Sequence, residues 1–196
     1  MTDGKKEGLR ERKRRETLVR IAEVGLRLFV ENGYDSTTLE AIAAEAGISA
    51  RTFFYYFGSK EEILQYWQGN GFFEALRPSL LAMSPEQAPL AAVHDCLIGL
   101  VSRYEDERSI VVDGLMRSTE ALRARKQALF VEMETTVYEA LCEVWPQQER
   151  WASLRIVAMV SIGTMRLAME AWRAEHGKRS LAEYVKDGFA RLQAEI

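Results

Sequence analysis

Apolar residues recur every three or four positions along almost the whole chain, and strand-like alternation is nowhere persuasive. Near the N-terminus one such stripe runs from Leu18 to Phe29 and ends before Asn32 and Gly33. After residue 60, further stripes predict helices over residues 61–82, 90–104, 108–117, 122–145, 151–172 and 181–196. Pro85 indicates a further helix start, because proline is favoured at the first helical position. The pattern therefore predicts an all-α protein.

Residues 37–57 predict two short helices joined by a tight turn. Thr37 begins a capping box with Glu40, in which hydroxyl and carboxylate satisfy each other's helix-end amides. Gly47 follows where a helix end favours a left-handed residue, and Ser49 can cap the second helix. This is the sequence form of a helix-turn-helix, although an ordinary helical hairpin would contain the same turn.

The second of these helices has two unlike faces. The apolar face, which we expect to be buried, consists of Ala50, Phe53, Phe54 and Phe57. The other face carries a guanidinium, hydroxyls and rings but no carboxylate, and it consists of Arg51, Thr52, Tyr55 and Tyr56. Such a face suits a negatively charged partner with polar edges, which is what the major groove of DNA offers.

Positive charge is concentrated just before this motif. The whole chain has a net charge of −3, but residues 5–15 contain seven Lys or Arg and two Glu, a net of 7 − 2 = +5. A basic run is usually a solvated tail, yet one that directly precedes a helix-turn-helix can reach phosphates or a minor groove. We therefore expect residues 1–15 to form a flexible basic arm, with Arg12 and Arg14 as candidate DNA contacts.

Residues 10–64 resemble the DNA-binding domain of the tetracycline-repressor-like (TetR) family of bacterial transcription regulators. The matching segments, in order, are RERKRRE, LFVENGYDSTT, LEAIAAEAG and ISARTFFYYFGSKEEIL. The resemblance implies a helix-turn-helix DNA-binding domain over residues 16–59 and a helical effector-binding and dimerisation domain over residues 60–196. It also implies DNA contacts from Thr37, Thr38, Ser49, Arg51, Thr52, Tyr55, Tyr56 and Lys60.

The chemistry of these side chains suggests separate roles. Arg51 can bond guanine at two acceptors, or it can pair with a phosphate. Thr52 can meet a thymine methyl or a phosphate, whereas Tyr55 and Tyr56 suit phosphates through their hydroxyls. The family often carries a small residue where Arg51 stands and histidine where Tyr56 stands.

The larger C-terminal part is expected to do two things. The last two predicted helices, over residues 151–172 and 181–196, resemble the dimer-forming pair of the family. Small residues would let helices approach closely there, or they are merely interior: Ala158, Ser161, Gly163, Ala168 and Ala171. The predicted partners are thus an operator duplex and a second copy of the chain.

The resemblance also implies a cavity for a small-molecule effector, hydrophobic or acyl-chain-like. Candidate wall residues, each of which could equally be ordinary core, are Trp67, His94, Tyr104, Met116, Tyr138, Arg155, Met159 and Arg166. Arg155 and Arg166 lie 11 positions apart and so project from nearly the same helix face. Their partner could be an anionic ligand, an acidic neighbour or water.

Composition argues against several other classes. Two histidines and two cysteines, Cys96 and Cys142, show no metal-ligand spacing, and no catalytic motif is visible. We therefore expect no catalytic residue, metal or cofactor. No secretory signal or membrane-spanning run is predicted, which favours the cytoplasm. The alternatives are a constitutive architectural DNA-binding protein without an effector pocket and an unrecognised all-α enzyme.

Overall fold

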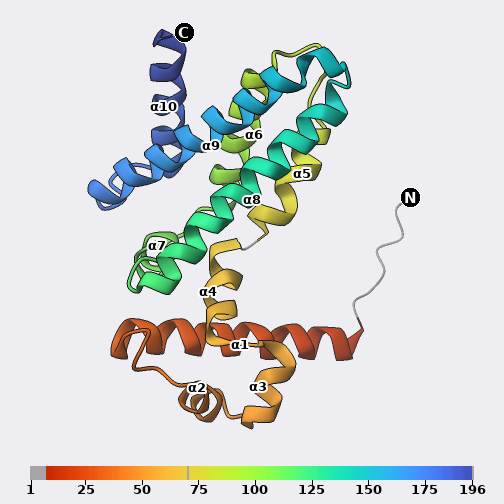
Figure 1. Ribbon diagram of the computed structural model, residues 1–196. Coiled ribbons are helices and arrows are strands. Elements are labelled where there is room, and N and C mark those ends of the chain that lie inside the picture. Colours follow the sequence, from red (N-terminus) through yellow and green to blue (C-terminus); the bar gives the residue numbers. More distant parts are fainter. Residues whose placement is uncertain (1–7, 70, 196) are drawn as a thin grey trace. The chain divides into compact units, whose positions relative to one another are not determined.

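The computed structural model describes residues 8–69 and 71–195, and within those ranges it contains helices and turns but no strand. The predicted all-α class is confirmed. The chain divides into two compact units (Figure 1), which we call the head and the body. The head ends at Gln68 but also includes Val111–Ser118, and the body comprises the rest. The functional division at residues 15 and 59 stays a prediction.

The head is built on one long helix, α1 (Leu9–Asn32), with the short helices α2 (Leu39–Glu45) and α3 (Ala50–Tyr56) beside it. Two further helices that lie mostly in the head are α4 (Lys60–Gly69) and α7 (Ser109–Leu115). The first four helices, together with Phe57 at the C-cap of α3, contribute buried residues to the head: Ile21, Ala22, Leu26, Phe29, Ile42, Ala43, Phe53, Phe57, Ile63 and Leu64. Gly25 allows α4 to approach α1, because a Cβ there would lie 2.7 Å from Ile63 Cδ1.

The caps of the two short helices agree only in part with the sequence prediction. Ser49 caps α3 as expected, accepting a hydrogen bond from the amide of Thr52 at 3.1 Å. The predicted capping box at Thr37 is wrong by one residue, because Thr38 is the N-cap of α2 and accepts from Ala41 N at 3.1 Å. Thr37 is buried instead, where its hydroxyl bonds α1 and the turn that follows it.

The body consists of α5 (Phe72–Leu81), α6 (Pro89–Tyr104), α8 (Glu120–Val144), α9 (Trp151–Ala174) and α10 (Leu181–Glu195). A short 3-10 turn, η1 (Gln148–Arg150), precedes α9. Helix α9 packs against α6, α8 and α10. At Gly188 of α10 a Cβ would lie 2.9 Å from Thr164 Cγ2 of α9, so glycine permits this close packing.

Two predicted helix bounds in this part are wrong. The helix expected over residues 61–82 is split into α4 and α5, and Gly71, with φ of +92°, precedes α5 in the left-handed conformation. Helix α6 begins at Pro89 rather than near Pro85. Both prolines fit a first helical turn, and the sequence alone does not decide between them.

The prediction that no segment could cross a membrane also needs correction. By length and composition alone, Gln148–Ala174 is apolar enough to span a bilayer. This segment is η1 followed by α9, and α9 supplies the body with core residues such as Leu154, Ile162 and Trp172. Its hydrophobicity is thus partly explained by packing inside the body.

Candidate nucleic-acid interface

Helix α3 is oriented by two phenylalanines in the core of the head. It has only seven residues, and an isolated helix of that length is not stable in water. Phe53 is fully buried and Phe57 is 4% exposed, with their ring centroids 6.0 Å apart. Burial of such a side chain contributes about 1.5–3 kcal/mol. These two anchors therefore fix which side of α3 faces solvent.

The outward side of α3 is centred on Arg51. Arg51 and Tyr55 are exposed as predicted, but Thr52 and Tyr56 are half-buried. The prediction that Phe54 is core is wrong, since this ring is 54% exposed. At about 100° per residue, Phe53 and Phe57 point to the buried side of the helix. Arg51 then lies between Phe54 on one side and Tyr55 on the other. The outward face is thus Phe54, Arg51 and Tyr55.

The hydroxyl groups at the start of α3 are engaged with each other. Ser49 Oγ lies 2.9 Å from Thr52 Oγ1 and also accepts from the Thr52 amide. Ser49 is exposed, so the cap lies at the surface beside Arg51. A surface cap of this kind can still meet a phosphate, because a hydroxyl can donate and accept at once.

Lys60, expected to contact the DNA backbone, is engaged inside the head. Its Nζ donates to Tyr34 O at 2.7 Å and to Thr37 O at 3.2 Å, and it lies 4.3 Å from the centroid of the Tyr34 ring. Burial, with the nearby Glu61 carboxylate, raises the pKa of the Tyr34 phenol above its ordinary value. Lys60 therefore binds the loop between α1 and α2 to the start of α4.

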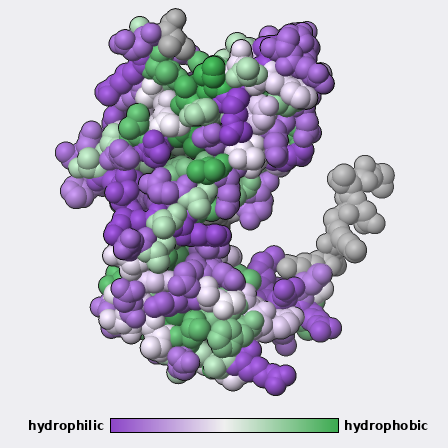
Figure 2. Space-filling model, in the orientation of Figure 1, coloured by the Kyte–Doolittle hydropathy of each residue, from purple (hydrophilic) through white to green (hydrophobic). Residues whose placement is uncertain are grey.

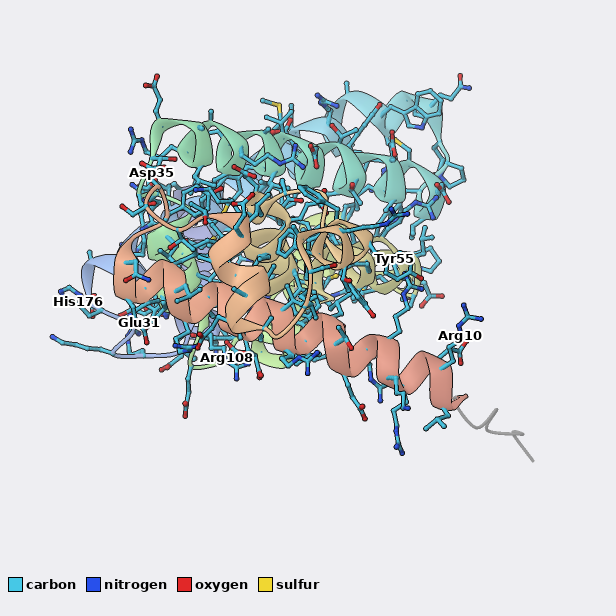
Figure 3. All side chains as sticks on the ribbon, turned by 90° about the horizontal axis from the view of Figure 1, so that it is seen from below. Arg10, Glu31, Asp35, Tyr55, Arg108 and His176 are labelled. Atoms are coloured by element: carbon cyan, nitrogen blue, oxygen red, sulfur yellow. The ribbon has the colours of Figure 1, made fainter. Side chains whose placement is uncertain are left out.

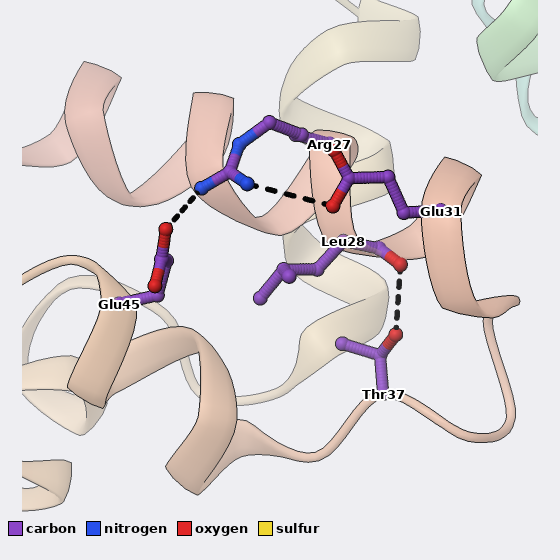
Figure 4. A network of polar contacts seen from close by, with 5 residues as sticks. All are labelled: Arg27, Leu28, Glu31, Thr37 and Glu45. Atoms are coloured by element: carbon purple, nitrogen blue, oxygen red, sulfur yellow. Dashed lines mark hydrogen bonds and ion pairs between the residues drawn. The ribbon is translucent and has the colours of Figure 1, made fainter.

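The same loop is held from the other side by α1 (Figure 4). Thr37 Oγ1 lies 3.1 Å from Leu28 O, the bond drawn in the figure, and 2.8 Å from Gly33 O. Arg27 pairs with Glu31 on its own helix and with Glu45 at the end of α2. These contacts set the position of α2, and Thr38 remains exposed at its N-terminus.

The basic segment differs from the flexible arm that we expected. From Leu9 onward it is the first two turns of α1, and Lys5 and Lys6 lie outside the described residues. Arg, Lys and Glu favour helix, and no Pro or Gly interrupts residues 9–18. Arg12 Nε pairs with Glu16 at 3.3 Å, whereas the Arg14 guanidinium lies 5.7 Å from the Tyr55 ring centroid. Arg14, unlike Arg12, is thus next to α3.

The structure does not gather the eight predicted effector residues around one point. Trp67 and Met116 lie in the head, where Trp67 Nε1 donates to Ala22 O at 2.9 Å. The other six lie in the body. Half-buried there are His94, beside Phe189, and Tyr104, beside Phe72.

The three pocket candidates on α9 are exposed, and Arg155 among them contacts Tyr138, the remaining candidate, on α8. Arg155, Met159 and Arg166 are all exposed. The Arg155 guanidinium lies 5.1 Å from the half-buried Tyr138 ring and 3.6 Å from Glu134. Arg155 and Arg166 do share one face of α9 and both are exposed, and Arg155 has an acidic neighbour in Glu134.

Comparison with known proteins bears on both units. Residues 21–66 match the family described as bacterial regulatory proteins, tetR family. The transcriptional regulator TcmR of Streptomyces glaucescens is 34% identical over 109 residues, 56% of this chain and 48% of TcmR. The chain thus spans about half the length of that relative.

Two solved structures are similar over nearly the whole chain. One is the complex of SmeT with triclosan, at 20% identity and a TM-score of 0.63, covering 90% of this chain and 91% of that one. The other is the regulator FadR from Bacillus subtilis in complex with stearoyl-CoA, at 20% identity and a TM-score of 0.61. This match covers 91% of this chain and 98% of the FadR chain. At this identity the likeness supports the fold, including the body. TcmR and FadR are both described as transcriptional regulators.

The position of Lys60 leads to a testable prediction about stability. Lys60→Met keeps most of the aliphatic stem but removes the ammonium that binds the carbonyls of Tyr34 and Thr37. Because hydrogen bonds to a charged group contribute roughly 1.5–3 kcal/mol, urea unfolding should show a loss of about that size. Lys186→Met, at an exposed position of α10, is the matched control and should change little. Equal unfolding free energies for Lys60→Met and wild type would show that the hydrogen bonds of Lys60 contribute nothing to stability.

Proposed function

Residues 21–66 of this chain are a DNA-binding domain of the tetR family of bacterial regulatory proteins, and on this premise we propose that the chain is a transcriptional repressor. A homodimer binds a palindromic operator through its two heads, and a small-molecule effector that binds the body releases it. The protein acts in the cytoplasm, where the DNA is. The alternative is a constitutive DNA-binding protein that senses no ligand.

The outward face of α3 is the observation that carries the DNA-binding part of this proposal. Arg51 and Tyr55 are exposed there, and the segment from residue 46 to residue 60 contains no carboxylate. Arg51 stands in the middle of the face, so it is the side chain best placed to reach a base edge, where a guanidinium bonds guanine at two acceptors. Phe54 adds an apolar ring that can contact a thymine methyl.

A binding titration of the full-length protein tests this assignment. Arg51→Ala should weaken binding to the DNA upstream of its own gene by roughly 1–3 kcal/mol, about 5- to 150-fold in Kd, and relax base preference at one position of each half-site. Arg125→Ala, at an exposed arginine of α8, is the matched control and should bind like wild type. Unchanged affinity of Arg51→Ala for every sequence tried would refute direct readout by this residue.

An exposed apolar stripe on α9 supports the homodimer. Its members lie within an arc of about 100°, on the side of α9 that faces away from the core: Ala152, Ile156, Met159, Val160, Gly163 and Leu167. Ile156 and Leu167 are 61% and 63% exposed, and apolar residues gather over α9 beside α10 in Figure 2. A Cβ at Gly163 would meet nothing within 4 Å, so a partner helix could approach closely.

Two exposed arginines beside this stripe favour a second copy of the chain over a lipid bilayer as the surface that covers it. Arg155 and Arg166 both lie along one edge of the stripe and are exposed, and a bilayer would have to take up both charges. A second copy of the chain leaves them at the polar rim of a two-fold interface, where charged residues are common. The buried side of α10, formed by Leu181, Val185 and Phe189, is already used within the body. Helix α9 is therefore the principal dimer helix in this proposal, with α10 beside it.

A single charge in the stripe should break the dimer. Leu167→Asp places a carboxylate in both halves of a two-fold contact, so the dimer Kd measured by analytical ultracentrifugation should rise at least about tenfold. Val131→Asp is the matched control, because Val131 of α8 is also 63% exposed but lies outside the stripe. A dimer that is equally stable in both variants would place the interface elsewhere, and weaker operator binding should accompany any loss of the dimer.

The effector part of the proposal is supported by the relatives. Solved structures with the same fold hold triclosan in SmeT and stearoyl-CoA in FadR. We therefore propose a hydrophobic or acyl-chain-like effector for this chain. A ligand that raises the melting temperature of the free protein and also releases the operator would distinguish a sensor from a constitutive binder.

A further inference from the structure

A single carboxylate at the end of α6 holds the start of α10. Glu105 follows the last residue of α6, and its own amide donates to Val101 O at 2.9 Å, so its backbone is fixed to the last helical turn. The Leu181 amide donates to both carboxylate oxygens of Glu105, at 3.0 Å to Oε1 and 2.8 Å to Oε2. Arg108, which follows Glu105, and His176, which precedes Leu181, both lie on the left in Figure 3. The two bonded residues are 76 positions apart, so the contact is tertiary.

The caps that α10 makes within its own segment use other groups. Ser180 donates to the Glu183 carboxylate through its amide at 3.1 Å and through its hydroxyl at 3.2 Å. Leu181 is the first residue of α10, and the amides of a first helical turn have no acceptor inside the helix. Leu181 is also only 7% exposed, so an amide left unpaired there would lose much of its hydration. Glu105 therefore supplies an acceptor that α10 does not provide for itself.

The position of α10 in turn sets the surroundings of α9, because α10 packs on both α6 and α9. The Phe189 ring of α10 meets His94 of α6 edge to face, with centroids 5.1 Å apart. Towards α9, a Cβ at Gly188 would lie 2.9 Å from Thr164 Cγ2. Thr164 is the sequence neighbour of Gly163, which belongs to the exposed apolar stripe of α9. The helix that Glu105 holds is thus in close contact with the back of that stripe.

The length of the Glu105 side chain matters more to this contact than its charge. Burial raises the pKa of Glu105 above its ordinary value, the bond from the Leu181 amide opposes that rise, and the Glu183 carboxylate adds to it. The surroundings as a whole therefore favour the neutral side chain. A neutral acceptor of the same length should hold the Leu181 amide about as well, whereas a shorter carboxylate would not reach it.

We infer that Glu105 is a positioning residue for the homodimer, because it fixes the start of α10 and so assembles α9 and α10 into one preformed surface before a second copy binds. The inference rests on the proposed function. A preformed surface loses less conformational entropy on association than one that must be ordered at that moment. Release of the start of α10 would also expose apolar residues that the body now buries, among them Leu181 and Val185.

Two conservative substitutions in the full-length protein separate reach from charge. Glu105→Asp keeps the charge but shortens the side chain, so hydrogen exchange at the start of α10 should become at least about tenfold faster, and the dimer Kd from analytical ultracentrifugation should rise at least about tenfold. Glu105→Gln keeps the length and one acceptor oxygen, so both quantities should stay within about threefold of wild type. Circular dichroism checks that each variant is folded.

A core truncation on a different helix separates positioning from general stability. Val137→Ala opens space in the buried core beside α8, so it should lower the unfolding free energy while the dimer Kd stays within about threefold of wild type. A dimer as tight in Glu105→Asp as in wild type, or one weakened equally by Glu105→Gln or Val137→Ala, would overturn the inference. A wild-type protein that stays monomeric over the whole concentration range would instead refute the homodimer of the proposed function.

Discussion

The burial of Phe53 and Phe57 is the constraint on which the rest of this molecule depends. Helix α3 has two turns and cannot hold its conformation alone, so its orientation comes from these rings. Once they are buried, the helical repeat leaves Arg51 facing outward between Phe54 and Tyr55. The chemistry offered to a partner is therefore decided by packing inside the head rather than by the polar residues themselves.

The surroundings of α3 reinforce this orientation with polar contacts of a different kind. Lys60 and Thr37 both bind backbone carbonyl groups around the loop between α1 and α2. Polar groups that could have met a partner are thus used to build the platform on which α2 and α3 stand. Preorganisation of this sort lowers the entropy lost on binding, and in our proposal it helps a small head to bind a rigid duplex.

The body uses one helix for two purposes. One side of α9 packs in the core through residues such as Leu154 and Ile162, and the side away from it carries the apolar stripe that includes Ile156 and Leu167. This double use explains why Gln148–Ala174 is so apolar overall without being a membrane segment in our proposal. In our proposal a homodimer covers the stripe and places two heads on one duplex.

The sequence predicts the helices and the fold class well because their apolar repeats extend over many turns. Sequence-based prediction fails where the position or role of a side chain depends on only a few residues. The short sequence of α3 does not distinguish Phe54 from its buried neighbours. A polar face of about 140° formed by Arg51, Thr52, Tyr55 and Tyr56 is as compatible with the helical repeat as the observed exposed face of about 100° formed by Phe54, Arg51 and Tyr55. Thr37 and Thr38 are adjacent and chemically alike, so only the tertiary contacts of Thr37 show which one caps α2. The role of Lys60 depends on carbonyls more than twenty positions away.

The orientation of α3 can be tested most directly by fluorine NMR of 4-fluorophenylalanine placed singly at position 53 or at position 54 of the full-length protein. Phe54 lies on the face that we assign to the duplex, and Phe53 is buried beneath it. Addition of the operator should shift the resonance at position 54 strongly and leave that at position 53 nearly unchanged. A shift confined to position 53, or no shift at either position under saturating duplex, would contradict the account.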